Sequence, residues 1–169
     1  MSSNNPLRAS VTYLPVLVRK SIQDWVEETA MQAVMDLERS LDYIPRDVSR
    51  DNCGYDIEST IPASGKLRFI EVKGRLQSAK TVTVTKNEIL TALNKPDDFI
   101  LAIVLVPPSD EGPGTDPWQM GDPALKYGTT LDGCRVYYIR RPFTKEPDFG
   151  VTSVNYKLRD LLAKGKTPS

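Results

Sequence analysis

The chain has 169 residues, equal numbers of basic and acidic side chains, and no histidine. This length suits a single domain with a full hydrophobic core. Without histidine, Ser-His-Asp catalysis, Cys-His catalysis and histidine-ligated zinc are excluded within this chain. Acid–base chemistry would therefore use carboxylates, lysine, tyrosine or metal-bound water. The zero net charge counts mildly against a nucleic-acid-binding protein, because such proteins are more often basic.

No segment is typical of membrane insertion or secretion. The sequence contains no run of about 18 apolar residues, and residues 1–8 lack the charged and then apolar pattern of a signal peptide. Cys53 and Cys134 have no spacing typical of a metal site or a disulfide framework. We therefore expect a cytoplasmic protein that does not associate with a membrane.

The first expected segment is an N-terminal arm over residues 1–17, followed by one domain over residues 18–169. A helix is expected to begin near Ser21, because Ser21 and Asp24 have the spacing of an N-terminal cap. Apolar residues then recur at helical spacing, and they are Ile22, Val26, Ala30, Ala33, Leu37 and Leu41. Residues 42–53 are expected to be irregular.

A β-hairpin is predicted next, with strands at about residues 55–60 and 67–73. The turn between them, residues 61–66, contains proline, serine and glycine, all of which favour turns. We expect Thr60 and Leu67 to close the hairpin. A shift of this register by one residue would exchange the two faces, and a shift by two would separate side chains that otherwise lie opposite.

In this register the hairpin brings charged residues together. Asp56 lies opposite Glu71, with Cβ atoms about 4.5–5.5 Å apart. Lys73 shares the face of Glu71, because residues two apart on a strand point the same way. Two carboxylates this close repel each other unless a cation lies between them. The other face would pair Tyr55 with Val72 in an apolar surface.

The second half of the chain adds strands and helices. Thr81–Thr85 alternates β-branched residues and predicts a strand. Residues 85–88 form a capping box for a short helix that reaches about Leu93. Phe99–Val106 is a run of eight apolar residues, which predicts a strand buried on both faces.

The remaining segments are a long loop, a strand and a helix. Residues 107–132 are rich in proline, glycine and aspartate and predict a loop, which Trp118 and Met120 would hold against the body. A last strand is expected at residues 134–139, and a final helix is expected after Asn155. The order of elements predicts an α/β fold, a mixed β-sheet flanked by helices.

Four sequence blocks together resemble a known family. They are DVSRDNCGYDIEST at 47–60, RFIEVKGR at 68–75, TVTVTKNEILTALN at 81–94 and DDFILAIVLV at 97–106. These blocks resemble the DUF3883 family, named for the C-terminal domain of the plant protein NO VEIN. The order of helix and strands resembles the PD-(D/E)xK nuclease superfamily. The resemblance covers roughly residues 20–160 and implies a restriction-endonuclease-like fold.

The resemblance implies a metal site. Asp56 matches the metal-binding aspartate of the superfamily, Glu71 matches the second ligand, and Lys73 matches the lysine that positions or activates water. With the carbonyl of Val72, the two carboxylates would bind Mg²⁺ or Mn²⁺. Many relatives carry a glutamate on the first helix, near the position where this chain has Gln32.

These roles predict a magnesium-dependent nuclease that acts on DNA more readily than RNA, together with a helicase, in DNA processing or phage defence. Expected nucleic-acid contacts are Arg75, Lys80, Lys86 and Asn87. One alternative is a catalytically inactive module that binds nucleic acid or docks on a helicase or defence protein. A purely protein-binding adaptor is another. A homodimer is compatible with each of these.

Overall fold

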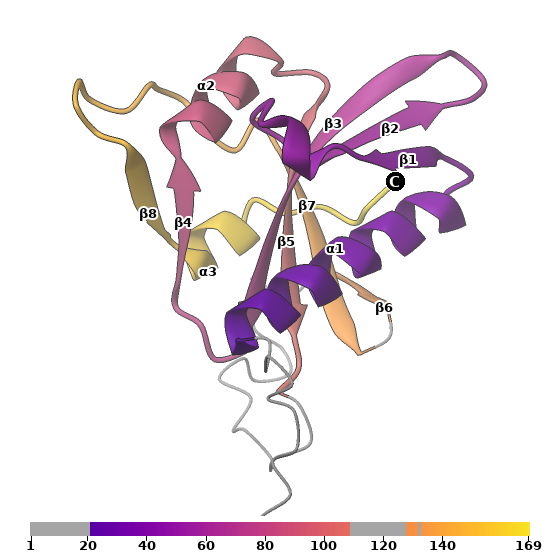
Figure 1. Cartoon of the computed structure of the whole chain (residues 1–169), viewed down its shortest axis with the longest axis horizontal. Coiled ribbons are helices and arrows are strands. Elements are labelled where there is room, and N and C mark those ends of the chain that lie inside the picture. Colours follow the sequence, from indigo (N-terminus) through magenta and orange to yellow (C-terminus); the bar gives the residue numbers. More distant parts are fainter. Residues whose placement is uncertain (1–20, 109–127, 132) are drawn as a thin grey trace, which may run out of the picture.

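The computed structural model describes residues 21–108, 128–131 and 133–169 (Figure 1). The main sheet has six strands, in the spatial order β1 (Ile44–Asp47), β2 (Ile57–Ile61), β3 (Lys66–Leu76), β5 (Phe99–Val106), β7 (Cys134–Arg140) and β6 (Thr129–Leu131). The β3–β5 pair is parallel and the other pairs are antiparallel. The predicted mixed α/β architecture is therefore confirmed. The predicted N-terminal arm lies outside the described residues.

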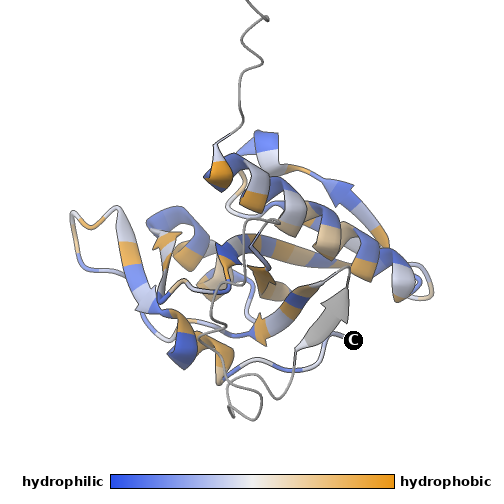
Figure 2. Ribbon diagram, turned by 90° about the horizontal axis from the view of Figure 1, so that it is seen from below, coloured by the Kyte–Doolittle hydropathy of each residue, from blue (hydrophilic) through white to orange (hydrophobic). Residues whose placement is uncertain are grey.

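Helices cover both faces of this sheet. Helix α1 (Ile22–Ser40) packs on one face, and α2 (Lys86–Asn94), α3 (Leu158–Leu162) and a two-stranded sheet of β4 (Thr81–Thr85) and β8 (Ser153–Lys157) pack on the other. Strand β5 supplies alternate residues to the two cores and is buried throughout, as its apolar run predicts. Figure 2 shows mostly hydrophobic central strands, whereas α1 carries both hydrophobic and hydrophilic residues.

Helix α1 begins where its cap predicts. The Ser21 hydroxyl accepts a hydrogen bond from the Asp24 amide, and the Asp24 carboxylate accepts one from the Ser21 amide. Ile22 belongs to the apolar stripe of the sequence, and such a stripe is expected to pack in the core, but Ile22 is 70% exposed. The buried stripe starts one turn later, at Val26, because this is where the helix reaches β3.

The contact between α1 and β3 requires a glycine. A Cβ atom on Gly74 would lie 2.7 Å from the Val26 carbonyl oxygen and 2.8 Å from the Ala30 Cβ atom. The helix backbone therefore rests directly on the strand, and any side chain at this position would push the helix away.

The predicted hairpin register is confirmed, with Thr60 paired to Leu67 and Ile57 to Ile70. The predicted pairing of Tyr55 with Val72 is wrong. The Tyr55 ring packs against Phe69 at 4.9 Å between centroids, on the opposite side of the sheet from Val72. The reason is that β2 begins only at Ile57, so Tyr55 lies outside the strand and does not follow its alternation.

Residues 42–53 are more regular than expected. They contain strand β1 and a 3₁₀ helix, η1 (Ser49–Asp51). Strand β1 has only four residues and includes Pro45, which a strand tolerates at the edge of a sheet. Most of the predicted loop at 107–132, with Trp118 and Met120, lies outside the described residues, and its last part forms β6.

The C-terminal segment also differs from expectation. Asn155 does not cap a helix; it lies in β8 opposite Thr83 of β4, and its side-chain oxygen accepts a 2.6 Å hydrogen bond from the Thr83 hydroxyl. Helix α3 begins three residues later, after Lys157. Strand β4 is confirmed, but it pairs with β8 and not with the main sheet.

A buried charged cluster fixes the C-terminal half of α1 to the sheet. Glu38 is fully buried, and its Oε1 atom accepts hydrogen bonds from the Tyr138 hydroxyl at 2.6 Å and from Arg68 at 3.2 Å. The Arg68 guanidinium also lies 4.5 Å from the centre of the Tyr43 ring. The buried Glu38 carboxylate and the buried Arg68 guanidinium therefore each neutralise the charge of the other.

Substitution of Glu38 with alanine should strongly destabilise the fold. The Arg68 charge would stay buried without its carboxylate, which typically costs about 3–5 kcal/mol. Denaturant titration of Glu38→Ala would measure this loss. Arg39→Ala is the control, since Arg39 pairs with Asp36 on the exposed face and should change stability by about 1 kcal/mol or less. Equal effects of the two substitutions would contradict this account.

Candidate functional site

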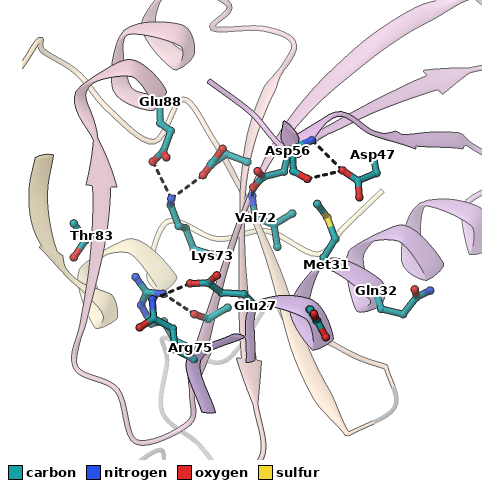
Figure 3. Close-up of a pocket in the computed structure, with 15 residues that line it drawn as sticks. Glu27, Met31, Gln32, Asp47, Asp56, Val72, Lys73, Arg75, Thr83 and Glu88 are labelled. Carbon is teal, nitrogen blue, oxygen red and sulfur yellow. Dashed lines mark hydrogen bonds and ion pairs between the residues drawn. The ribbon is translucent and has the colours of Figure 1, made fainter. Parts of the chain in front are cut away.

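A cleft of about 740 Å³ lies where α1, the second half of β3, β4 and the start of α2 come together (Figure 3). It is strongly acidic. Two basic side chains line it, Lys73 and Arg75, together with six carboxylates: Glu27, Glu28, Asp47, Asp56, Glu71 and Glu88. The cleft therefore has oxygen atoms that could bind a cation, and its excess of negative charge would attract one.

Asp56 is held in the cleft by the edge of β3. Strand β2 pairs with β3 only as far as Ile70, so the next residues of β3 have no partner on this edge among the described strands. The Asp56 Oδ2 atom accepts the amide hydrogen of Val72 at 2.9 Å. The Val72 carbonyl faces the same way, because a strand residue directs both its backbone groups to one neighbour.

Glu71 and Lys73 share the cleft face of β3, as their spacing predicts. The Lys73 Nζ atom lies 2.7 Å from Glu71 Oε1 and 2.9 Å from Glu88 Oε2. Glu71 is only 4% exposed. The lysine therefore bridges two carboxylates from different elements, as the dashed lines in Figure 3 show for Glu88.

Glu88 has a second role that its sequence position does not reveal. The capping box predicted at the start of α2 is confirmed, with the Thr85 amide donating to Glu88 Oε2 at 2.9 Å. The same oxygen contacts Lys73. The capping bond fixes the carboxylate, and the carboxylate in turn fixes the lysine. Local spacing predicts only the cap, because nothing in it shows that α2 begins beside β3.

Burial governs the protonation of the site. It raises the pKa of Glu71 to about 8, and the nearby Asp56 and Glu88 carboxylates add to the rise while Lys73 opposes it. Burial also raises the pKa of Asp56, although the Val72 amide and Lys73 act against it. Burial lowers the pKa of Lys73, but its two carboxylate partners outweigh burial and raise it overall.

Of the expected nucleic-acid contacts, Arg75 lines the cleft, and its Nη1 atom donates to the Gly74 carbonyl oxygen at 2.6 Å. Lys80, Lys86 and Asn87 do not line it. Asn87 lies instead beside Gly54, where an added Cβ atom would come within 3.1 Å of the Asn87 amide nitrogen.

Helix α1 and strand β1 add cleft residues that sequence reasoning did not assign to the site. Glu27 and Glu28 line the cleft from α1, next to Gln32, which donates a 2.8 Å hydrogen bond to Asp36. Asp47, at the end of β1, accepts hydrogen bonds from the backbone amide and hydroxyl of Ser49. The sequence did not indicate a place for Asp47 in the cleft, because residues 42–53 were expected to be irregular and β1 was not predicted.

The donor set fits a hard divalent cation. Carboxylate oxygens of Asp56 and Glu71 and the Val72 carbonyl are the ligand types that Mg²⁺ prefers, and Mg²⁺ typically uses one or two carboxylates and keeps several waters. Within the part of the chain that the structure describes, no three cysteine or acidic side chains are close enough to hold an ion by themselves. Water would therefore complete any coordination here.

The raised pKa of Glu71 makes the stability of the metal-free protein depend on pH. The folded state holds a proton on Glu71 that the unfolded chain releases above about pH 4.5, so the stability that this proton contributes is lost as pH rises through about 8. Glu71→Gln should remove much of this decline. Thermal unfolding in EDTA from pH 5 to pH 9 would compare the two proteins. Parallel curves for both would contradict a raised pKa.

The comparisons with known proteins give one family. The family described as "Protein NO VEIN, C-terminal" matches residues 26–115, which include most of α1, all of β1 to β5 and every carboxylate of the cleft. No significant match was found among curated proteins or solved structures. No helix in the described part of the chain is long and apolar enough to cross a membrane. The family match spans just over half of the chain, and the protein belongs to the NO VEIN C-terminal family.

Proposed function

We propose that this protein is a metal-dependent nuclease that hydrolyses phosphodiester bonds of nucleic acid, with DNA as the favoured substrate. The main support is the convergence of Asp56, Glu71 and Lys73 in one cleft. Asp56 accepts a hydrogen bond from the Val72 amide, which holds it at the unpaired edge of β3. The Lys73 Nζ atom lies 2.7 Å from Glu71 Oε1. Asp56, Glu71 and the Val72 carbonyl would hold Mg²⁺ or Mn²⁺.

The chemistry is the addition of water across one P–O bond. The bound ion would polarise the phosphate and acidify a water molecule. The water oxygen bonds to phosphorus, the bond to the leaving sugar oxygen breaks, and that oxygen takes up a proton. Lys73 would orient the water and stabilise negative charge on the phosphate. Its carboxylate partners favour the protonated lysine, which this role needs.

A catalytically inactive module is the second candidate. Two observations favour it. Lys73 already forms ion pairs with Glu71 and Glu88, and among the described residues no three acidic side chains are close enough together to bind a metal ion. Such a module would bind nucleic acid or a helicase through its surface and would be indifferent to loss of Asp56. A helicase partner is part of both proposals and comes from the family resemblance.

Cleavage assays with purified protein test the first proposal. DNA and RNA substrates should be cleaved in Mg²⁺ or Mn²⁺ and not in EDTA. Asp56→Ala and Lys73→Ala should each lower the rate by about 100-fold or more, the usual effect of removing a group that stabilises the transition state. Asp36→Ala, which removes a carboxylate on the surface of α1, is the control. Cleavage that survives Asp56→Ala would exclude this site.

Metal binding can be tested without activity. Millimolar Mg²⁺ should raise the melting temperature of the wild-type protein at pH 8, since a ligand at 100 times its dissociation constant adds about 2.7 kcal/mol. Glu71→Gln should melt higher than wild type in EDTA, because it removes an acid whose ionised form is disfavoured by burial. It should also gain less from Mg²⁺. A wild type that Mg²⁺ leaves unchanged would argue against the metal site.

A further inference from the structure

The two-stranded sheet of β4 and β8 has an outer face made of hydrogen-bonding side chains. The three cross-strand pairs on this face are Thr81 with Lys157, Thr83 with Asn155, and Thr85 with Ser153, and all six residues are exposed. The inner face is apolar and packs into the core. No acidic side chain belongs to the outer face, which we call the polar ribbon.

Lysines stand at both ends of the polar ribbon. Lys80 precedes Thr81 at the end where Lys157 lies, and its carbonyl accepts the Leu158 amide. At the other end, the Lys86 amide donates to the Thr152 carbonyl. Lys80 and Lys157 are exposed and Lys86 is half-buried. The ribbon therefore presents hydroxyl and amide groups between positive charges.

Strand propensity explains only part of this composition. Threonine is common on exposed strands, so Thr81 and Thr83 need no ligand. Asparagine is depleted in strands, yet Asn155 lies in the middle of β8. Its side-chain oxygen accepts the hydrogen bond of the Thr83 hydroxyl, and its amide group brings donors to an exposed residue.

The cleft itself is a poor place to gain affinity for a polyanion. Its six carboxylates outnumber its two basic groups, and Lys73 is already shared by Glu71 and Glu88. A phosphate backbone would be repelled from most of this surface in the absence of a cation. Binding energy for a nucleic acid must therefore come from a neighbouring surface without acids. The polar ribbon adjoins the cleft, because Thr83 belongs to both (Figure 3).

We propose that the polar ribbon binds the sugar–phosphate backbone of a nucleic acid and leads the strand into the cleft; the second half of this statement rests on the proposed nuclease function. Hydroxyl, amide and lysine groups are the usual protein contacts of phosphates. Four steps between the five paired residues of a strand span about 14 Å. Measured along the axis of B-form DNA, where the phosphates of one strand rise by about 3.4 Å per nucleotide, this length corresponds to about four nucleotide steps.

The test is nucleic-acid binding by the full chain in EDTA, where nothing is cleaved. Fluorescence anisotropy with labelled single-stranded and duplex DNA would give the affinity over a range of salt concentrations. Removal of three phosphate contacts in Lys80→Ala/Lys86→Ala/Lys157→Ala should flatten the plot of log affinity against log salt by about two to three units.

A control with the same change in charge uses Arg39, Arg46 and Lys66. These exposed residues lie on α1, β1 and the β2–β3 hairpin, on the other side of the molecule from β4 and β8 (Figure 1). Their combined replacement with alanine should leave the slope close to that of wild type. An equal loss in both triple variants would show that net charge, and not the polar ribbon, determines binding, and would overturn the proposal.

A second variant leaves the net charge unchanged and keeps residues that favour a strand. Thr81→Val/Thr83→Val keeps β-branched side chains on the strand but removes two hydroxyls. It should weaken binding at every salt concentration without changing the slope. Wild-type affinity in this variant and in the lysine variant together would exclude the ribbon. A wild type that binds no nucleic acid would exclude it as well, and a protein ligand would then be the better occupant.

The outcomes separate this proposal from the nuclease function. Binding that depends on the ribbon, with no cleavage of any substrate in Mg²⁺, would support the ribbon and contradict the nuclease. Cleavage that depends on Asp56, with unchanged binding and cleavage in the lysine variant, would support the nuclease and overturn the ribbon.

Discussion

The site depends on the early end of β2. A strand two residues longer at its N-terminal side would pair with β3 beyond Ile70 and would satisfy the Val72 amide with a carbonyl group. Instead the chain bends, and the side chain of Asp56 takes this amide. A buried amide without a partner is costly, so the backbone itself requires an acceptor here. That requirement explains why a side chain with an acceptor oxygen lies at this edge of β3, and the alternation of β3 directs Glu71 and Lys73 to the same cleft.

Charge balance then links the elements around β3. One lysine contacts two carboxylates, and one of these also caps α2. Helix α1 closes the other side and can lie this near only because Gly74 has no side chain. The position of the lysine thus depends on a helix cap, and the width of the cleft depends on a glycine. A substitution that moves α1 or α2 would therefore also change the charge interactions within the cleft.

Local patterns in the sequence predict the elements on which the site is built. Alternation and turn residues predict the β2–β3 register, and the capping boxes at Ser21 and Thr85 predict two helix starts. Pairing between distant segments leaves no such signal. The partner of β4 lies about 70 residues further along the chain, so Asn155 resembles a helix cap until Thr83 is seen opposite. For the same reason the sequence predicts the capping role of Glu88 but not its contact with Lys73.

The apolar sequence of β5 affects how the chain folds. Its eight residues are apolar without interruption and fully buried in the folded protein. Before β3 and β7 flank it, such a segment is prone to aggregate with other chains. Two aspartates precede it and two prolines follow it, residues that oppose strand association between molecules. Asp98 later pairs with Lys66 and Asp97 with Arg141. Two charges that would oppose association of the unfolded segment thus form surface ion pairs once the sheet has closed.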